Sequence, residues 1–252
     1  MTTTTELLLI AGIAGGMVNA LAGGATLITF PAMLAAGLPP VVANASNAVA
    51  IAPGHLIAAL VDRRQLPRFD SSLMLAVAMS AGGGLAGALL LLVLPERLII
   101  LPLPALIGGA TLLFVAAPRL QVWALKRQTE RGSPHVGALF ALAGASIYGG
   151  FFGAGLGILL TAMLAIFNAG ELRAIKALKN LLATSVSVAA TALFIVRGIV
   201  AWQQTVVMLT GALAGGYAGG LLIRTMPAGI VRSIVIAAGA LMTIIYAYRY
   251  WF

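Results

Sequence analysis

Long apolar segments follow one another along almost the whole chain, and they constrain its fold more than any other feature. They cover residues 7–36, 41–61, 71–94, 97–117, 136–168, 171–196, 200–223 and 228–248. About 20 apolar residues are enough for a helix to cross the hydrocarbon core of a bilayer. Only 8% of the residues are charged, whereas a soluble domain carries about 25%. The sequence therefore predicts an all-α membrane protein with several crossings and no separate soluble domain.

The stretch from Gly12 to Asn47 carries residues that a plain lipid anchor would not need. Gly23-Gly24 and Pro31 interrupt it, and glycine and proline weaken or break helices. It also contains the asparagines Asn19, Asn44 and Asn47, and a buried amide is costly without a partner. Broken backbone at membrane depth is tolerated only where protein or a water-filled cavity surrounds it. We therefore expect this stretch to line a site.

The chain repeats itself at a spacing of 132 to 134 residues. The matching pairs are Gly15–Ala20 with Gly149–Ala154, Asn44–Ala50 with Ala177–Ala183, and Gly83–Leu90 with Gly215–Leu222. Three matches in one order are more than a shared apolar bias explains. Internal duplication is typical of secondary transporters, whose site lies between the two halves. The prediction is a first repeat at 1–117, a cytoplasmic linker at 118–135 and a second repeat at 136–252.

The distribution of Lys and Arg distinguishes two topologies. If all eight segments cross the membrane with both termini inside, nine basic residues lie inside and six outside. If segments 7–36 and 136–168 are re-entrant hairpins, the division becomes twelve against three, which fits the positive-inside rule better. Each half then has a re-entrant or broken hairpin plus three transmembrane helices, so the two repeats are inverted and both termini lie outside. A tilted or kinked single span is the alternative for each hairpin.

The glycine breaks predict a site for a negatively charged ligand. A helix that starts inside the protein presents free backbone N–H groups and the positive end of its dipole. Gly23-Gly24 in the first half, and Gly153 to Gly157 in the second, are the expected breaks. The alternative is that these glycines only let helices pack closely.

Polar side chains in segments 41–61 and 171–196 add to this hypothesis. Asn47 and Asn180 are repeat equivalents, so we expect them to face each other across a pseudo-two-fold axis. The expected substrate-binding residues are Asn19, Gly23, Gly24, Asn44, Asn47, Lys179 and Asn180. Lys179 would supply the positive charge that an anion requires, although it could be a loop charge, and the asparagines could simply bond each other. His55 is a possible proton carrier, with a hydrogen-bonded helix-end histidine as the alternative.

The remaining composition narrows the function. The acidic residues all lie near segment ends or in loops: Glu6, Asp62, Asp70, Glu96, Glu130 and Glu171. This placement disfavours a cation substrate and a buried carboxylate relay. There is no cysteine, P-loop pattern, catalytic triad or metal-binding spacing, so we expect no enzyme activity, cofactor or metal. The charge of +9 fits cytoplasmic loops, not nucleic acid. The expected partners are a small anion, membrane lipid and a possible second copy. Glycine-rich faces such as Gly211 to Gly220 could serve either the packing of the two repeats or a dimer contact.

The duplicated glycine pattern resembles the TauE/SafE family of sulfite and organosulfonate exporters. The residues that carry the resemblance are Gly15-Gly16 leading to Gly23-Gly24, Pro31, Gly37 and Ala43–Asn47, echoed by Gly149-Gly150 to Gly157 and Lys176 to Asn180. It implies a bacterial inner-membrane secondary transporter, an exporter of sulfite, sulfoacetate or other sulfonates by alternating access. The second half departs from the family pattern because Gly157 is followed by Ile158-Leu159-Leu160. A passive anion channel and a non-transporting assembly subunit of a membrane complex are the alternatives.

Overall fold

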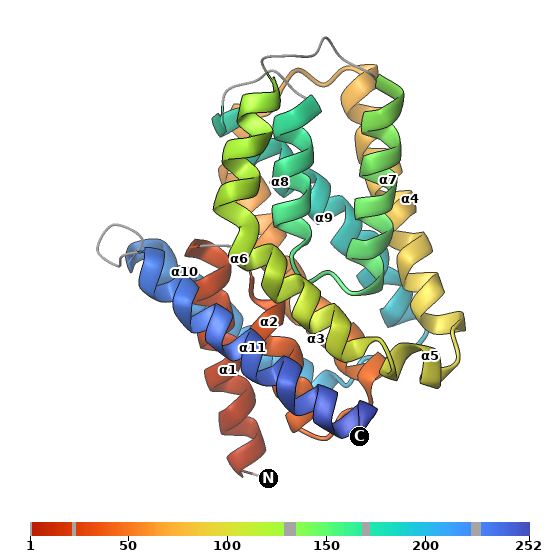
Figure 1. Ribbon diagram of the computed structural model, residues 1–252, viewed down its shortest axis with the longest axis vertical. Coiled ribbons are helices and arrows are strands. Elements are labelled where there is room, and N and C mark those ends of the chain that lie inside the picture. The colour runs from red at the N-terminus through yellow and green to blue at the C-terminus, as the bar shows by residue number, and fades with distance from the viewer. Residues whose placement is uncertain (1, 22–23, 129–134, 168–171, 223–227) are drawn as a thin grey trace.

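The computed structural model describes residues 2–21, 24–128, 135–167, 172–222 and 228–252, and these residues form helices joined by short turns, with no strand among them (Figure 1). The helices are α1 (Thr2–Leu21), α2 (Thr26–Ala35), α3 (Pro40–Val61), α4 (Ser71–Val93), α5 (Glu96–Ile100), α6 (Leu103–Gln128), α7 (His135–Phe151), α8 (Leu156–Phe167), α9 (Leu172–Val196), α10 (Trp202–Leu222) and α11 (Ala228–Trp251), with a 3₁₀ turn, η1, at Arg63–Gln65. The all-α prediction is confirmed for the described residues.

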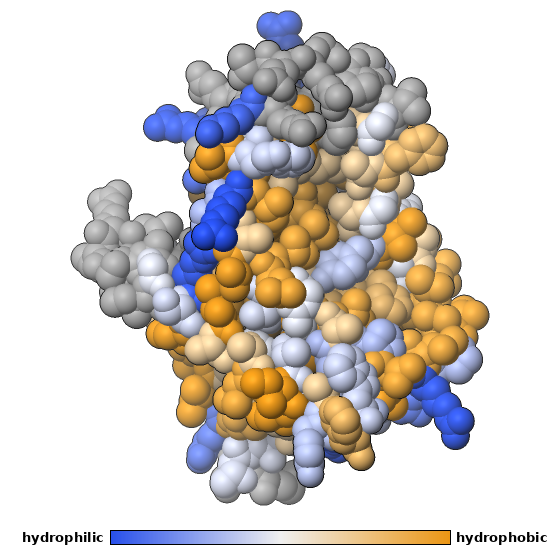
Figure 2. All heavy atoms as spheres, in the orientation of Figure 1, coloured by the Kyte–Doolittle hydropathy of each residue, from blue (hydrophilic) through white to orange (hydrophobic). Residues whose placement is uncertain are grey.

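Six helical stretches are long and apolar enough to cross a membrane. They are Thr3–Ala20, Pro40–Val61, Ser71–Val93, Glu96–Ala124, Arg173–Val196 and Arg232–Trp251. Large apolar side chains cover the outside of the molecule: Val93 is 77% exposed and Val196 is 83% exposed. Figure 2 shows apolar side chains over most of one face, with strongly hydrophilic ones mainly toward its edges. Such a surface fits a hydrocarbon surrounding, and the chain is a multi-pass membrane protein.

Local sequence explains where several helices begin and end. Pro40 occupies the first position of α3, where a missing N–H costs nothing. The turn before it contains Gly37 with φ +87°, a conformation that favours glycine. Asp70 caps α4 by accepting a 2.8 Å hydrogen bond from the Leu73 N–H.

Each glycine-rich segment that raised the question of a hairpin is broken into two helices. Among the described residues, segment 7–36 contains α1 and α2, and segment 136–168 contains α7 and α8. In Figure 1, α1 rises from the end of the molecule where both chain termini lie, whereas α7 descends from the opposite end. The return helices α2 and α8 have only 10 and 12 residues.

The linker was expected to begin at residue 118, but no helix ends there. α6 continues through Pro118 to Gln128, so the first part of the stretch 118–135 is helical. Proline has no N–H to donate to the carbonyl four residues earlier, which is that of Phe114. Arg232 of α11 replaces the missing donor, with its Nη2 3.0 Å from the Phe114 oxygen and 2.6 Å from the Val115 oxygen.

Two parallel helix pairs make the closest contacts between distant parts of the chain. Gly12 and Gly16 of α1 lie against the backbone of α10, and Gly211, Gly215 and Gly219 of α10 lie against α1. The α4–α7 pair is built in the same way, with Gly83, Gly84 and Gly87 facing Gly150 and its neighbours. A Cβ at Gly16 or Gly215 would overlap a carbonyl oxygen of the facing helix. Small residues at every fourth position let membrane helices approach this closely, so three glycines of the 211–220 stretch serve internal packing.

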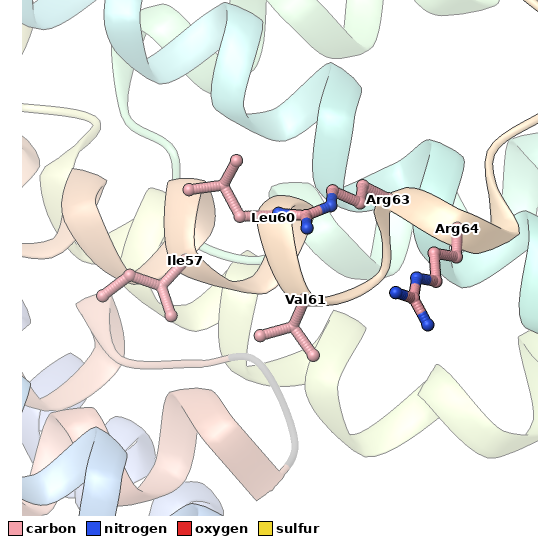
Figure 3. A pocket seen from close by; sticks show the side chains of 5 residues that line it. All are labelled: Ile57, Leu60, Val61, Arg63 and Arg64. Carbon is pink, nitrogen blue, oxygen red and sulfur yellow. The ribbon is translucent and has the colours of Figure 1, made fainter.

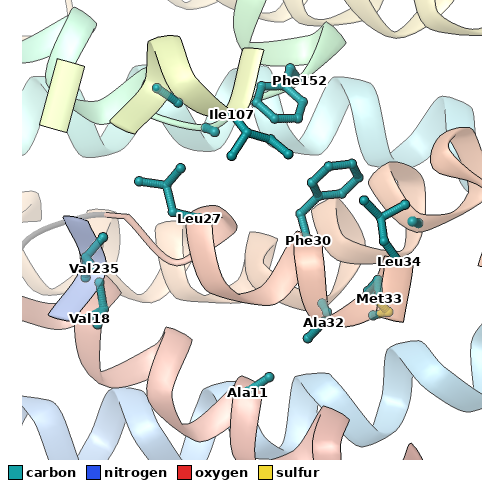
Figure 4. Packing of buried hydrophobic residues seen from close by; sticks show 14 of the residues in the cluster. Ala11, Val18, Leu27, Phe30, Ala32, Met33, Leu34, Ile107, Phe152 and Val235 are labelled. Atoms are coloured by element: carbon teal, nitrogen blue, oxygen red, sulfur yellow. The ribbon is translucent and has the colours of Figure 1, made fainter. Parts of the chain in front are cut away.

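The central core surrounds the ends of the return helices. Leu27, Phe30 and Met33 of α2 pack with Ile107 of α6 and with Phe152, which follows α7 (Figure 4). The rings of Phe30 and Phe152 meet edge to face with centroids 5.4 Å apart, a preferred geometry for aromatic pairs. The two glycine-rich segments therefore meet inside the molecule.

Candidate functional site

The break between α7 and α8 is a well-defined loop held by side chains. Gly153 and Gly155 have φ values of +76° and +80°, which glycine adopts readily. The Tyr148 hydroxyl donates to the Ala154 oxygen at 2.6 Å, and the Asn44 side-chain amide donates to the Phe151 oxygen at 2.8 Å. Carbonyl groups that leave a helix end need such partners inside a membrane. The prediction of a break at Gly153 to Gly157 is confirmed.

The start of α8 leaves a backbone donor free. The N–H groups of Leu156, Ile158 and Leu159 bond the carbonyls of Gly153 or Gly155. Within the described residues, the Gly157 N–H has no backbone acceptor. The Lys179 side chain passes beside it, since its Cδ lies 3.8 Å from where a Gly157 Cβ would be. A free N–H at a helix start next to an ammonium group is suited to an anion.

Lys179 belongs to a polar cluster where α3 and α9 pack together. The Asn180 amide donates to Oδ2 of Asp62 at 2.7 Å. Asp62 attracts Lys179 electrostatically, although the two form no direct ion pair in the described part of the chain. The positive charge of Lys179 also interacts electrostatically with His55. Asn180 is buried, with 7% of its surface exposed. The cluster thus contains one carboxylate, one ammonium, one imidazole and one amide.

Asn19 approaches this cluster from the first half of the chain. Its Nδ2 lies 3.2 Å from the position that a Cβ at Gly54 would take, so Asn19 packs on α3 one residue before His55. Gly24 is buried against the ring of Phe114. Gly23 lies outside the described residues. The break between α1 and α2 is confirmed as far as the described residues, which end at Leu21 and resume at Gly24.

The expectation that Asn47 and Asn180 face each other is wrong. Asn180 bonds Asp62 just past the end of α3, while Ser46 near its start accepts a hydrogen bond from the Ala201 N–H just past α9. α3 and α9 are therefore antiparallel. Fifteen residues of helix separate Asn47 from Asp62, about 22 Å at 1.5 Å per residue. Asn47 is 1% exposed, and its side-chain oxygen has no partner within the described residues.

Asp62 is the residue of this cluster that the sequence interpretation did not select, because it lies at the end of its segment. The sequence nevertheless contained a signal that could have identified Asp62. Asp62 follows His55 by seven residues, two helical turns, and so continues the stripe of polar residues that begins with Asn44 and Asn47. Its side chain then turns toward α9 and not toward solvent alone.

A cavity of about 410 Å³ lies beside the α7–α8 break. Its lining consists of Ala105, Leu106, Gly109, Ala110, Leu113, Tyr148 and Leu159. Only Tyr148 brings a polar side chain, and its hydroxyl proton is already donated to Ala154. This cavity offers an anion no free side-chain donor, so Lys179 and the start of α8 are the better candidate site.

Comparison with known proteins supports a transport role for this chain. The chain is 31% identical to "Probable membrane transporter protein YfcA" of Escherichia coli (strain K12) over 234 residues, which cover 90% of this chain and 84% of the relative. It is 26% identical to "Probable membrane transporter protein" of Haemophilus influenzae over 242 residues, which cover 96% of this chain and 94% of that relative. No solved structure gives a significant match. The family model "Sulfite exporter TauE/SafE" matches residues 8–246, and the chain belongs to the TauE/SafE family of membrane transporters.

Proposed function

We propose that this membrane transporter is a secondary transporter that exports small sulfur-containing anions, such as sulfoacetate, other sulfonates or sulfite, across a bacterial inner membrane. The observation that carries the proposal is the convergence of the free Gly157 N–H and the Lys179 side chain, with the amide of Asn180 in the same cluster. These groups donate hydrogen bonds and positive charge. The family description names sulfite, a small oxyanion that suits such donors.

Helix lengths support two re-entrant hairpins. At 1.5 Å per residue, α2 is about 15 Å long and α8 about 18 Å, roughly half of a hydrocarbon core about 30 Å thick. A short turn joins α2 to α3, and α3, with 22 residues, is about 33 Å long. The α1–α2 break therefore falls near mid-depth, and α2 returns to the side from which α1 entered. In the second half, α9 has 25 residues, enough to cross the core, and only four residues of sequence separate it from α8.

Helix pairing supports an inverted repeat. The repeat makes α1, α2, α3, α4, α6 equivalent to α7, α8, α9, α10, α11. α1 packs on α10, and its counterpart α7 packs on α4, while α3 packs on α9 and α6 on α11. Exchange of the two halves leaves this set of contacts unchanged. We infer three true spans in each half, α10 included, and an exchanging motion of the halves around the central site.

The charges suggest the orientation. Arg63, Arg64 and Arg68 follow α3, at the end opposite the two chain termini in Figure 1. By the positive-inside rule the end with these arginines is cytoplasmic, so both termini lie outside. Lys179 and Asp62 then belong to the cytoplasmic half of the molecule, where an exported anion would first be bound.

The residues of the site have distinct roles in this proposal. Lys179 pairs with the anionic charge, while Asn19, Asn180 and the Gly157 N–H donate to its oxygens. Gly24 lets the first hairpin approach Phe114 of α6, and Gly23, which precedes it in the sequence, is kept as a proposed binding residue. Asn44 holds the second break through the Phe151 carbonyl, and the unpaired oxygen of Asn47 is left for a partner that arrives in another transport state. His55 is a candidate proton carrier beside Lys179.

The first test is thermal stabilisation of the purified protein by sulfite, sulfate, sulfoacetate, taurine and acetate. A ligand that binds only the folded state raises the melting temperature. A shift confined to sulfite or sulfonates supports the proposal and identifies the substrate class. No shift with any of them, for protein shown to be folded, contradicts it and favours an assembly subunit.

Flux measurements separate a transporter from a channel. In proteoliposomes loaded with unlabelled anion, a carrier exchanges internal for external anion, and uptake of labelled anion saturates. A channel gives conductance without exchange and without saturation. Exchange is the expected outcome because the proposed motion of the two halves exposes the site to one side of the membrane at a time.

A further inference from the structure

The end of α3 carries a groove with two arginines at its rim (Figure 3). Its volume is about 450 Å³, and its lining is Ile57, Leu60, Val61, Arg63 and Arg64. The aliphatic side chains are exposed: 49% for Ile57, 51% for Leu60 and 75% for Val61. The buried residues of α3 lie mainly in its first half, from Pro40 to Ala50, and Ala59 is the one buried residue near its end. The last two turns therefore present an uncovered apolar surface.

The spacing of these residues makes one continuous stripe. Ile57, Leu60 and Val61 follow the pattern i, i+3, i+4, which places them on one side of α3. The 3₁₀ turn η1 begins at Arg63, directly after the Asp62 cap, so the arginines stay next to the last helical turn. The stripe changes from aliphatic to cationic over about 10 Å. In Figure 3 the Arg63 side chain extends over Leu60, and Arg64 projects on the side of Val61.

Neither guanidinium group has a protein partner among the described residues. Asp62 precedes both arginines, but its Oδ2 accepts from Asn180 on another helix. Both arginines are exposed. An arginine fork matches the geometry of a phosphate group, and two adjacent forks without carboxylates leave a strongly anion-selective rim.

We propose that this groove binds an anionic phospholipid, with its phosphate on Arg63 and Arg64 and an acyl chain along Ile57, Leu60 and Val61. An acyl chain needs an apolar strip that runs from the membrane surface toward the interior, and the stripe on α3 provides one. A small soluble anion would gain nothing from the three aliphatic side chains. Basic pockets at the cytoplasmic ends of membrane helices recognise anionic head groups in this way. The proposal is independent of what the central site transports.

The test measures lipid binding to the purified protein in neutral detergent. Phosphatidylglycerol is titrated against phosphatidylcholine with the same acyl chains, by native mass spectrometry and by thermal shift. Wild type should prefer phosphatidylglycerol, and the double variant R63Q/R64Q should bind it roughly thirtyfold more weakly, since each basic group near a membrane surface contributes about a factor of five. Binding of phosphatidylcholine should not change.

Matched variants keep the result interpretable. Arg68→Gln removes a neighbouring exposed charge that does not line the groove and should retain the preference. Leu60→Ser should weaken both lipids equally. The melting temperature without lipid, compared among the variants, shows that each is folded.

Three outcomes overturn the proposal: no preference in wild type, an equal loss in Arg68→Gln, or full competition by inorganic phosphate. The second outcome would mean that the charge acts diffusely, and the third that the groove takes a soluble anion. Loss of the preference in R63Q/R64Q alone supports the assigned site.

Discussion

The side-chain amide of Asn180 donates a 2.7 Å hydrogen bond to Oδ2 of Asp62, a residue 118 positions earlier in the chain. This bond joins the end of α3 in the first half to α9 in the second. It also means that the proposed anion site already holds a carboxylate, which attracts Lys179 electrostatically. A substrate anion that approaches Lys179 must therefore compete with Asp62 for the same positive charge.

Replacing Asp62 with Asn should strengthen anion binding. The variant keeps an oxygen that can accept from Asn180 but removes the negative charge that repels the substrate. Like charges about 6–8 Å apart repel by about 2 kcal/mol at an effective dielectric constant of 20, so we expect a roughly thirtyfold lower Kd for the best-binding anion. The measurement is a ligand titration by thermal shift or calorimetry.

Glu96→Gln is the control for this prediction, because Glu96 lies at the start of α5, and the 23-residue helix α4 separates it from the end of α3 where Asp62 lies. It should leave the Kd unchanged. Unaltered affinity in Asp62→Asn, in a protein that still binds anions, would show that Asp62 does not compete with the substrate. The central proposal of anion transport would survive that result.

Lys179→Gln should weaken anion binding by about tenfold to a hundredfold, since a hydrogen bond to a charged group contributes about 1.5–3 kcal/mol. Lys176→Gln is the matched control on the same helix. Lys176 is exposed whereas Lys179 is partly buried, so the control should bind normally. Both variants should retain the wild-type helix content by circular dichroism. If the two substitutions have the same effect, the contribution is a general surface potential and not a contact.

The sequence predicted local features of the fold well and the meeting of distant residues poorly. The breaks near Gly24 and Gly153 follow from backbone chemistry that a short stretch already contains. Asn47 and Asn180 occupy equivalent positions in the repeat that the sequence predicts, yet equivalence does not make two residues neighbours. In an antiparallel pair, only residues near the crossing point face their own counterparts. Here Asn180 meets Asp62, so the crossing lies well beyond Asn47.

The extension of α6 beyond residue 117 shows a second limit. Pro118 weakens a helix by removing one hydrogen bond, which favoured a boundary there. The structure restores a donor to the Phe114 carbonyl from Arg232, 118 residues later. A compensation at that separation depends on how α6 and α11 pack, which the local sequence does not specify.

Gly215→Ala should destabilise the protein, and Gly220→Ala should not. A Cβ at Gly215 would overlap the carbonyl oxygen of Ile13 on α1, whereas a Cβ at Gly220 meets nothing within 4 Å. Both glycines lie in α10, so the gain in helix propensity is the same, up to about 1 kcal/mol. Overpacking costs about 1–3 kcal/mol, and it acts at Gly215 only.

The measurement for this pair is the melting temperature in one detergent. We expect Gly215→Ala to melt several degrees lower than wild type, and Gly220→Ala to melt at the same temperature or higher. Equal melting temperatures for the two variants would mean that α1 and α10 are not packed backbone to backbone. Gly16→Ala, on the other side of the same contact, should repeat the result of Gly215→Ala.

Arg232→Gln should destabilise the α6–α11 pair, and Pro118→Ala should reduce that effect. In wild type, Arg232 supplies the donor that the Phe114 carbonyl lacks because of Pro118. Removal of the guanidinium leaves that carbonyl unsatisfied, at a cost of about 1–3 kcal/mol. With alanine at position 118, the helix supplies its own N–H, so the same loss of Arg232 should cost clearly less.

A double-mutant cycle tests this coupling through the unfolding free energies of wild type, both single variants and the double variant. We expect an interaction energy of about 1 kcal/mol or more, because the two sites share one carbonyl group. Arg249→Gln, also on α11, is the control and should show no coupling to position 118. Strictly additive effects of Arg232→Gln and Pro118→Ala would mean that Arg232 stabilises the protein by another route, such as its bond to the Val115 oxygen.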